Sequence, residues 1–260
     1  MGSRNEIKLP GRIPEAFYVI IMHMLKIYIL DASPLKNGEL FNSIYETMTP
    51  YRKTRIDRLK PAASKRESLG AGYLLSRALS ELGCSYLLDA LKDGPNGKPY
   101  FDCSLLPSGK SDDIFFNLSH SGEMVMCAIA HKPVGCDIQK MDKDVFKIAR
   151  RCYAEGEKNY VLGKYAADEF EDADLRDIIP ELEIKGINDR FYRIWVMKEA
   201  YTKLSGEGIQ RDFRSFDVLD VPGHFLEYKL NDHRLAVCMD ENDDIAAFDK
   251  PEIVTIKGIN

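Results

Sequence analysis

The stretch RIWVMKEAYTK, from Arg193 to Lys203, holds the only tryptophan of the chain and places Glu199 four residues before Lys203. On a helix this spacing lets a carboxylate and an ammonium group meet on one side. The spacing is also that of an exposed ion pair, which stabilises a helix by only about a few tenths of a kcal/mol. Taken alone, the helix therefore leaves the role of both residues open. The opposite, core-facing side would consist of Ile194, Met197, Tyr201 and Leu204.

A second candidate is the segment VGCDIQ, in which Asp137 and Gln139 stand two residues apart in a predicted strand. Alternate residues of a strand point to the same face, so their side-chain oxygens could bind one Mg²⁺ ion. Magnesium is commonly held by a few carboxylate oxygens together with water and substrate phosphate. The competing interpretation is a carboxylate at a strand end that accepts hydrogen bonds from turn amides.

The segment NLSHSG, residues 117–122, contains the neighbouring pair Ser119 and His120, which suggests a hydrolase. Neighbours in a strand point to opposite faces, whereas a nucleophile and its base must lie within hydrogen-bond reach, and the chain has no G-x-S-x-G elbow. A polar turn with amides, hydroxyls and an imidazole is better suited to bind a phosphate group. A purely structural turn would also explain the segment.

The charge of the chain is nearly balanced, with 41 acidic against 36 basic residues and a net charge of −5. This balance argues against a nucleic-acid wrapper or a membrane-surface binder, so any bound polyanion needs a local cluster of bases. The six cysteines form no C-x-x-C pair, and four lie in apolar runs, so we expect reduced thiols in a cytoplasmic protein. The longest apolar stretch, residues 17–30, is interrupted by His23 and Lys26 and is too short to span a bilayer.

Hydrophobic periodicity predicts a mixed α+β fold. An amphipathic helix should end at Gly83 and place Leu75, Ala78, Leu79 and Leu82 on its apolar face. Asp144 is a candidate cap for a further helix, and the acidic run 168–177 has too few apolar residues for a core segment. Further expected elements are a strand at 26–31, a turn at Asn96–Gly97, three strands within 114–142, a helix at 191–204, and antiparallel strands within 216–242 joined by turns at Pro222–Gly223 and Asn231–Asp232.

Together and in this order, the segments FNLSHSG, VGCDIQ and WVMKEAYTK resemble the motifs of the surfactin-synthetase type of 4'-phosphopantetheinyl transferase. That family combines a strand of the form G-[IVC]-D-x-[EQ] with a later W-x-x-K-E-[AS]-x-x-K helix. Each motif is weak alone, whereas the ordered set is highly specific. The resemblance extends from about Lys26 to beyond Gln210 and covers most of the chain.

In that family, coenzyme A donates its phosphopantetheine arm to a serine hydroxyl of an apo acyl or peptidyl carrier protein and leaves adenosine 3',5'-bisphosphate. The resemblance implies that Asp137 and Glu199 bind Mg²⁺, or Mn²⁺ in its place, against the pyrophosphate, with Gln139 at the third position. It also implies that Glu199 is the base for the carrier serine and that Lys203 binds the attacked phosphate. Many family members have glutamate where this chain has Gln139, and an amide oxygen is a poorer Mg²⁺ ligand.

The resemblance implies further residues for the nucleotide part of coenzyme A. Ser119 and His120 would hold the 3'-phosphate and the ribose, and Lys98 would lie by the nucleotide. Phosphoryl transfer asks a protein chiefly to position its reactants and neutralise charge, so bases from several segments fit this task. The family's basic N-terminal region is matched by Arg52, Arg55 and Ser68, which are assigned to the 3'-phosphate.

The resemblance also implies two similar α/β halves related by pseudo-twofold symmetry, with the active site at their interface. The first half would span residues 22–132 and the second residues 133–260, after an N-terminal extension at residues 1–21. We expect a monomer that binds coenzyme A and an apo carrier protein, without nucleic acid or a membrane.

Two other functions are compatible with the same residues. A Mg²⁺-dependent pyrophosphohydrolase would cut coenzyme A or a nucleotide with water as the nucleophile. A non-catalytic carrier-binding module would keep the fold without turnover, and the intact Asp137, Glu199 and Lys203 argue against it. Incubation with coenzyme A and Mg²⁺, with and without an apo carrier protein, separates the three functions.

Overall fold

The computed structural model describes residues 24–94, 96–106, 113–142, 145–167, 178–206, 212–240 and 251–256. The predicted extension at residues 1–21, the cap at Asp144 and the acidic run at residues 168–177 lie outside these ranges. The described residues form two groups of helices and strands, which confirms the predicted α+β class.

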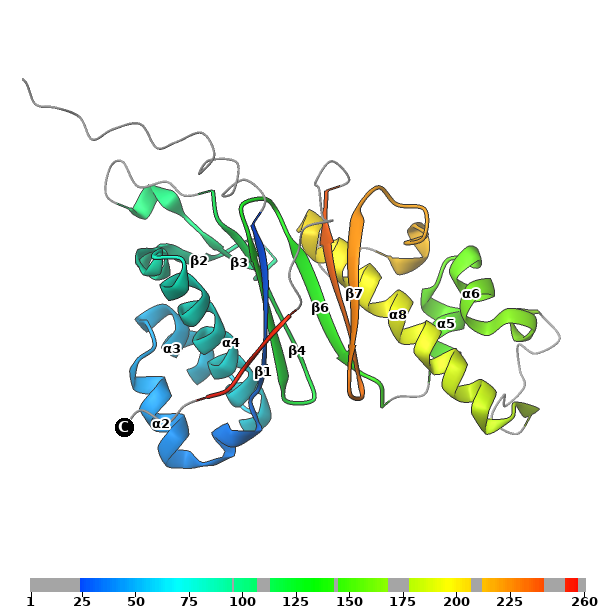
Figure 1. The fold of residues 1–260 in the computed structure, drawn as a ribbon, viewed down its shortest axis with the longest axis horizontal. Helices are drawn as coiled ribbons and strands as arrows, with labels where there is room; N and C mark the ends of the chain where they lie inside the picture. Colours follow the sequence, from blue (N-terminus) through cyan, green and yellow to red (C-terminus); the bar gives the residue numbers. More distant parts are fainter. Residues whose placement is uncertain are drawn as a thin grey trace, which may run out of the picture.

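The first group of elements is a sheet with helices packed on one side (Figure 1). Strand β1 (Leu25–Asp31) pairs antiparallel with β5 (Met124–Ala130), and β5 pairs antiparallel with β4 (Phe115–Ser121). A separate short hairpin joins β2 (Leu91–Asp93) to β3 (Pro99–Phe101) across the predicted Asn96–Gly97 turn. The helices are α2 (Gly38–Glu46), α3 (Pro50–Asp57) and α4 (Ala62–Glu81), with 3₁₀ turns at Ser33–Lys36, Ser85–Ala90 and Cys103–Leu105.

Helix α4 is the long helix that covers this sheet, as its apolar spacing predicts. Leu75, Ala78 and Leu79 are fully buried on the face that packs against the strands, whereas Leu82, at the end of the helix, is only partly buried. The helix ends before Gly83, whose φ of 70° lies in the left-handed region that a glycine adopts without strain. The N–H of Cys84 then donates to the Leu79 carbonyl over 2.8 Å, which satisfies one of the last carbonyls of the helix.

The second group of elements repeats the arrangement with a different long helix. Strand β6 (Gly135–Lys140) pairs antiparallel with β8 (His233–Met239), and β8 pairs antiparallel with β7 (His224–Leu230). Helix α8 (Glu181–Ser205) packs across β6 and β8. The remaining elements are α5 (Phe146–Cys152), α6 (Glu155–Leu162) and 3₁₀ turns at Gly163–Ala166 and Phe213–Ser215.

The two groups share one order of elements along the chain and one order of strands in the sheet. In each, a strand is followed by helices and then by a hairpin, and the first strand pairs with the second strand of that hairpin. The order β1-β5-β4 therefore corresponds to β6-β8-β7. This common topology agrees with two similar halves, while the symmetry axis itself stays a prediction.

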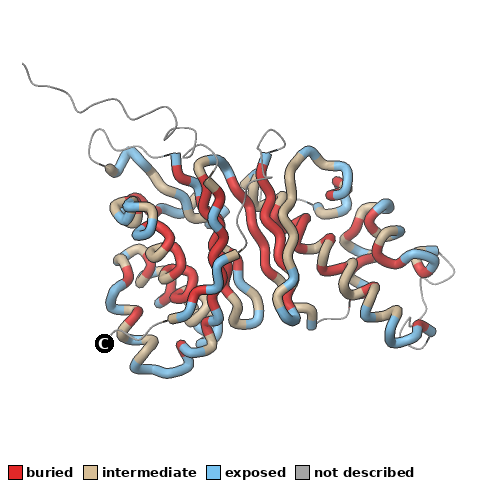
Figure 2. Tube along the Cα trace, viewed as in Figure 1, coloured by how far each residue is buried: buried red, intermediate tan, exposed pale blue. Residues whose placement is uncertain are grey.

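Three apolar clusters hold these layers together. One lies between the first sheet and α4, and another lies between the second sheet and α8. The third lies between the two sheets and is built from alternate residues, such as Ile27 and Ile29 of β1 and Cys136 and Ile138 of β6. Figure 2 shows the resulting run of buried strand residues through the centre of the molecule.

Two predicted elements differ from the structure. Helix α8 begins ten residues before the expected start at 191, because the less apolar first turns still pack, with Ile187 fully buried. The segment 216–221, expected to be a strand, lies in turns between Phe213–Ser215 and β7, so only the hairpin around Asn231–Asp232 is confirmed. Asn231 adopts a φ of 52°, which suits the tight turn between β7 and β8.

The C-terminal strand returns to the first half of the chain. Strand β9 (Glu252–Val254) pairs in parallel with β1. Arg77 of α4 donates to both Glu81 and Glu252 over 2.9 Å, which fastens β9 to that helix. A boundary near residue 133 stays a prediction, and the residues that follow it are not confined to the second sheet.

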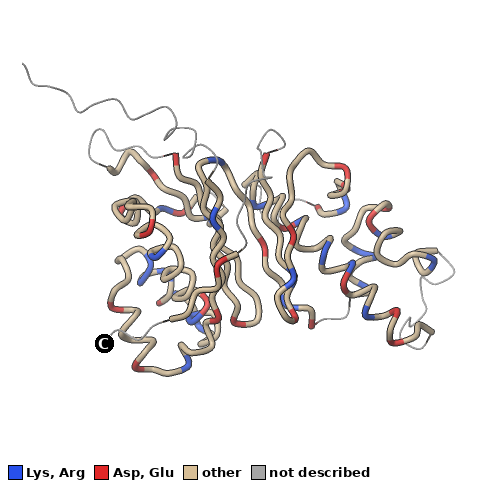
Figure 3. Tube along the Cα trace, viewed as in Figure 1, with Lys and Arg blue, Asp and Glu red and all other residues tan. Residues whose placement is uncertain are grey.

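Several expectations from composition can be compared with the structure. No disulfide joins the six cysteines, of which Cys127, Cys136 and Cys238 are buried and Cys103 is exposed. No helix in the described ranges is both long and apolar enough to cross a membrane. Basic and acidic residues are interspersed over both halves (Figure 3), in keeping with the small net charge.

Candidate active site

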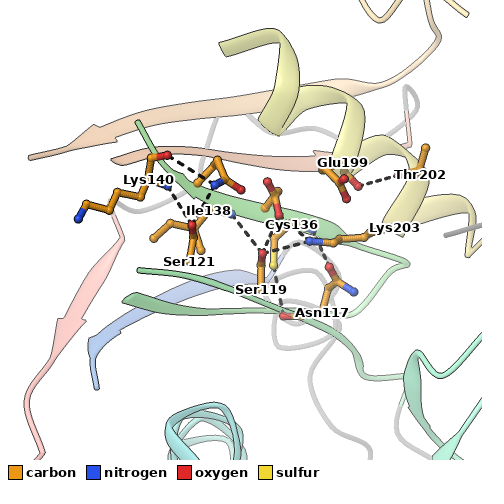
Figure 4. A network of polar contacts seen from close by, with 11 residues as sticks. Asn117, Ser119, Ser121, Cys136, Ile138, Lys140, Glu199, Thr202 and Lys203 are labelled. Carbon is orange, nitrogen blue, oxygen red and sulfur yellow. Dashed lines mark hydrogen bonds and ion pairs between the residues drawn. The ribbon is translucent and has the colours of Figure 1, made fainter. Parts of the chain in front are cut away.

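The two sheets are joined along β4 and β6 by side chains in place of backbone carbonyls. From Asn117 on, every second residue of β4 points at β6 and accepts a hydrogen bond from its backbone (Figure 4). Since a buried N–H without an acceptor is costly, these side chains satisfy an edge that would otherwise be orphaned. The pairs are Asn117 with the N–H of Cys136 (2.9 Å), Ser119 with that of Ile138 (3.3 Å) and Ser121 with that of Lys140 (3.1 Å).

Gly135 brings helix α8 against strand β6. A Cβ atom at this position would lie 2.0 Å from the carbonyl oxygen of Ala200 and 2.5 Å from the backbone nitrogen of Leu204. Only glycine permits so close an approach of two backbones. The contact places the last turns of α8, and with them Glu199 and Lys203, beside the strand that carries Asp137.

Asp137 is at the centre of the polar network between these elements, and only 4% of it is exposed. Its Oδ1 accepts hydrogen bonds from the Ser119 hydroxyl and from the Lys203 ammonium group, both over 2.6 Å. Lys203 also donates to the Ser119 oxygen over 3.0 Å. The second carboxylate oxygen of Asp137, Oδ2, is buried and has no hydrogen-bond partner.

Glu199 faces the same place from α8 and is 9% exposed. Burial, followed by repulsion from Asp137, raises the pKa of Glu199 to about 6, although Lys203 acts in the opposite sense. Burial alone would lower the pKa of Lys203, but the carboxylates of Asp137 and Glu199 outweigh it and raise that pKa. The interpretation of Glu199 and Lys203 as an exposed ion pair is therefore wrong, because Glu199 is buried and Lys203 bonds to Asp137.

The donor set fits a divalent cation. Two carboxylates in a poorly solvated site repel each other, and the unpartnered Oδ2 of Asp137 is an oxygen that a cation could satisfy. Gln139 lies on the same strand face, and its amide nitrogen donates to the Ser121 hydroxyl over 3.0 Å. In the described ranges no three His, Cys, Asp or Glu side chains gather as a metal site.

A cleft of about 850 Å³ opens next to this network. It is lined from both halves, by residues of α3, α4, the β2–β3 turn and β4 and by Glu199 and Lys203 of α8. The predicted residues that line it are Arg52, Arg55, Ser68, Lys98, His120, Glu199 and Lys203.

Arg52 is the most deeply buried base of the cleft, with 4% exposure. Burial lowers the pKa of its guanidinium group to about 10, and its Nε and Nη2 atoms have no hydrogen-bond partner. Gly72 of α4 makes room for it, since a Cβ atom there would lie 2.8 Å from the Arg52 Cγ atom. An unpaired, buried guanidinium group beside a cleft is suited to an anion.

Three other bases have partners within the protein. Arg55 bonds to Asp93, and Lys98 donates to the backbone carbonyl of Lys203, which ties the β2–β3 turn to α8. Burial lowers the pKa of Lys98, and the neighbouring Lys203 adds to this shift. His120 is half-exposed, with its Nδ1 atom 3.2 Å from a Glu67 carboxylate oxygen.

Ser119, Asp137 and Gln139 do not line this cleft. Ser119 is buried, and its hydroxyl is already bonded to Asp137, Lys203 and the Ile138 N–H. Ser119 and His120 do point to opposite faces of β4, as the strand period predicts. The assignment of Ser119 to the 3'-phosphate stays a prediction, whereas its contacts describe a residue that holds Asp137.

Sequence reasoning missed several polar residues of the site. Arg58 and Ser64 line the cleft, and Asn117 and Ser121 complete the junction between the sheets. The sequence spacing could have indicated Arg58 of the cleft and the polar residues of the junction. Arg58 continues the three-residue spacing of Arg52 and Arg55, and the polar residues 117, 119 and 121 recur with the period of a strand.

A second cleft of about 700 Å³ lies on the other side of Glu199, which borders both clefts. Its lining combines arginines with aromatic rings. The residues are Arg150, Arg151, Cys152, Trp195, Glu199, Asp212, Phe213 and Arg214.

Comparison with known proteins supports the resemblance indicated by the motifs. Residues 133–247 match the family model of the 4'-phosphopantetheinyl transferase superfamily. The chain is 34% identical over 129 residues to a 4'-phosphopantetheinyl transferase of Bacillus subtilis, covering 49% of this chain and 46% of the relative. It is 31% identical over 135 residues to the 4'-phosphopantetheinyl transferase gsp of Aneurinibacillus migulanus, covering 52% and 46%.

A longer match is found to the 4'-phosphopantetheinyl transferase psf-1 of Bacillus pumilus, with 27% identity over 197 residues, 74% of this chain and 73% of the relative. The chain spans about half the length of the first two relatives it matches. The resemblance to the surfactin-synthetase type of 4'-phosphopantetheinyl transferase is thereby confirmed, and the matched family region contains Asp137, Gln139, Glu199 and Lys203.

Proposed function

We propose that this chain transfers the 4'-phosphopantetheine arm of coenzyme A to a serine hydroxyl of an apo carrier protein and releases adenosine 3',5'-bisphosphate. The observation that carries the proposal is that Glu199 and Lys203 line a cleft whose other walls supply arginine, lysine and histidine, while Lys203 is bonded to the buried Asp137 behind the cleft wall. Phosphoryl transfer needs this combination of positioned acids and bases, because coenzyme A and the transition state carry concentrated negative charge.

Coenzyme A suits the cleft by its charges. Its 3'-phosphate and its pyrophosphate are separated groups, and the bases of the cleft come from separated segments of the chain. We assign the unpaired Arg52, together with Arg55 and His120, to the 3'-phosphate, and Lys98 and Lys203 to the pyrophosphate side. Asp93 also lines the cleft, but Arg55 neutralises it.

We assign Mg²⁺, or Mn²⁺ in its place, to the Oδ2 atom of Asp137 and the carboxylate of Glu199, with the amide oxygen of Gln139 at a third position. When bound, the metal would neutralise charge on the pyrophosphate. The chain itself holds the ligands in place, because Ser119 and Lys203 fix the other oxygen of Asp137.

The reaction exchanges one phosphorus–oxygen bond for another. The serine oxygen bonds to the phosphorus that carries the pantetheine arm, and the bond from that phosphorus to the bridging oxygen of the pyrophosphate breaks. The bridging oxygen leaves with the electron pair as part of adenosine 3',5'-bisphosphate. Glu199 accepts the serine proton, and Lys203 stabilises the charge on the attacked phosphate.

The position of Glu199 between two clefts suggests how both substrates reach it. Coenzyme A would fill the cleft that contains Arg52, and the carrier serine would approach through the cleft that contains Trp195 and Arg151. The six cysteines form no disulfide, which suits a reducing compartment, so we propose a cytoplasmic location. A monomer is the proposed working form.

Mass spectrometry of apo carrier proteins tests this function. Incubation with coenzyme A and Mg²⁺ should add one phosphopantetheine to one serine, and chelation of the metal should prevent it. Adenosine 3',5'-bisphosphate that accumulates without a carrier protein would instead identify a pyrophosphohydrolase. Absence of any product, with a carrier that still binds, would identify a non-catalytic module.

A further inference from the structure

Lys198, the neighbour of Glu199 on α8, is fully buried in the apolar cluster of the second half. Its ammonium group donates to the Glu157 carboxylate over 2.5 Å and to the Phe216 carbonyl over 2.7 Å. It also lies 4.0 Å from the centre of the Phe216 ring. The lysine of the W-x-x-K-E motif, to which no role was assigned above, therefore has a defined binding pocket of its own.

Glu157 joins three segments of the second half at this point. Besides Lys198 of α8, its Oε1 atom accepts the Val218 N–H over 2.7 Å, and its Oε2 atom accepts the Ala154 N–H at the start of α6 over 2.9 Å. Glu157 is fully buried as well. Its hydrogen bonds to α6, α8 and the segment before β7 are directional. They therefore favour one rotation of α8 about its own axis over slightly different rotations.

The rotation of α8 decides where Glu199 points. Successive residues of a helix are about 100° apart around its axis, so an anchored Lys198 side chain sets the direction of the next one. Glu199 and Asp137 are both buried, and two carboxylates in a poorly solvated site repel each other, so a restraint from elsewhere is needed to keep them facing one place. The opposing restraint comes from the buried side of the helix.

Stability alone does not require an ion pair here. Apolar side chains of similar volume often replace a buried ion pair at no cost or with a gain, because both charges lose their hydration when buried. The ion pair differs from apolar side chains of the same volume in that its hydrogen bonds are directional. We propose that Lys198 and Glu157 are positioning residues that hold α8 at the rotation in which Glu199 and Asp137 can share one divalent cation.

This inference rests on the proposed function and is tested by metal binding, without turnover. The variant Lys198→Met/Glu157→Leu replaces the ion pair by apolar side chains of similar size. Thermal unfolding should show a folded protein at least as stable as the wild type. Binding of Mn²⁺ in the presence of coenzyme A, followed by electron paramagnetic resonance, should weaken about 10-fold or more, the usual effect of losing a residue that orients a metal ligand.

The matched control is a second ion pair of the same helix. Arg193 donates to Glu227 of β7 over 2.6 and 2.8 Å, and it stands more than one turn before Glu199. The variant Arg193→Met/Glu227→Leu also removes an ion pair that fastens α8, but none next to the metal ligand. Its Mn²⁺ affinity should equal that of the wild type.

The outcomes separate the inference from the proposed function. A folded Lys198→Met/Glu157→Leu variant that binds Mn²⁺ as tightly as the wild type would overturn the positioning role. If that variant does not fold, Lys198→Arg decides, since it keeps the charge but displaces the helix, and an unchanged Mn²⁺ affinity again overturns the inference. A wild-type chain that binds no Mn²⁺ with coenzyme A present would overturn the proposed function itself.

Discussion

The two halves of the chain share one succession of strand, helices and hairpin, yet they present different chemistry to the cleft between them. The first half contributes most of the bases, with Arg52 the most buried. The second half contributes Glu199 and Lys203 and holds the buried Asp137 next to them. In each half one glycine makes this possible. Gly72 leaves space for the Arg52 side chain, whereas Gly135 leaves space for the backbone of α8.

The comparison shows that shared topology does not determine function. What differs is the element that each glycine brings close: Gly72 of α4 leaves room for a side chain of helix α3, whereas Gly135 of β6 leaves room for the backbone of α8. Substitutions in the two halves should therefore fail in different ways, the second half losing catalysis and the first half losing affinity for coenzyme A.

The largest effect is expected at the carboxylates of the second half. Asp137→Asn and Glu199→Gln keep side-chain volume but remove the charge offered to the metal, so transfer should fall by about 10²–10³-fold. Thermal unfolding should show an intact fold for both variants. Near-normal turnover at saturating Mg²⁺ in either variant would remove that residue from the metal site.

Substitution of Gly135 should separate the helix from the strand. Gly135→Ala places a Cβ atom into the Ala200 carbonyl, and since neither backbone can yield freely, the free energy of unfolding should fall by about 3 kcal/mol, with loss of transfer. Gly38→Ala is the control, because no atom lies within 4 Å of the added carbon. Urea unfolding measures both, and equal stabilities would contradict the close packing of α8 on β6.

In the first half, Arg52→Met should stabilise the protein but weaken its binding of coenzyme A. Removal of a buried guanidinium group with two unpartnered nitrogens should raise the free energy of unfolding by about 1 kcal/mol without ligand. The same change should weaken coenzyme A binding by about 10-fold, as expected for a charged hydrogen bond. Calorimetry measures the binding, and Arg77→Met, whose ion pairs are exposed and lie outside the cleft, should alter neither quantity by much. If Arg52→Met bound coenzyme A as tightly as the wild type, Arg52 would not contact the 3'-phosphate.

The smallest effect is expected at Gln139, where the second half carries an amide in place of a carboxylate. Gln139→Glu adds charge at the assigned third position, and the Ser121 hydroxyl can donate to the new carboxylate in place of the lost amide donor. The Mg²⁺ concentration for half-maximal rate should fall by about 3-fold. An unshifted midpoint would leave Asp137 and Glu199 as the only protein ligands.

Much of this arrangement follows from local patterns in the sequence. The apolar spacing of Leu75, Ala78 and Leu79 predicts α4, and the period of two in CDIQ correctly places Asp137 and Gln139 on one face of a strand. Such patterns are readable because a helix or a strand repeats its side-chain directions over a few residues, whatever surrounds it. The ordered motifs likewise indicate a resemblance to the family, and residues 133–247 match the model of its superfamily.

The pairings across the chain were decided only by tertiary structure. The sequence presents Glu199 and Lys203 as partners, but folding brings Lys203 to Asp137, 66 positions away, and buries Glu199. It also buries Lys198 against Glu157 and joins β6 to the side chains of β4. These contacts could not be predicted locally, because burial and the partner of a charge depend on how distant segments pack. The free energy of pairing or of desolvation of a side chain is set by its neighbours in space, and these are defined only by the tertiary structure.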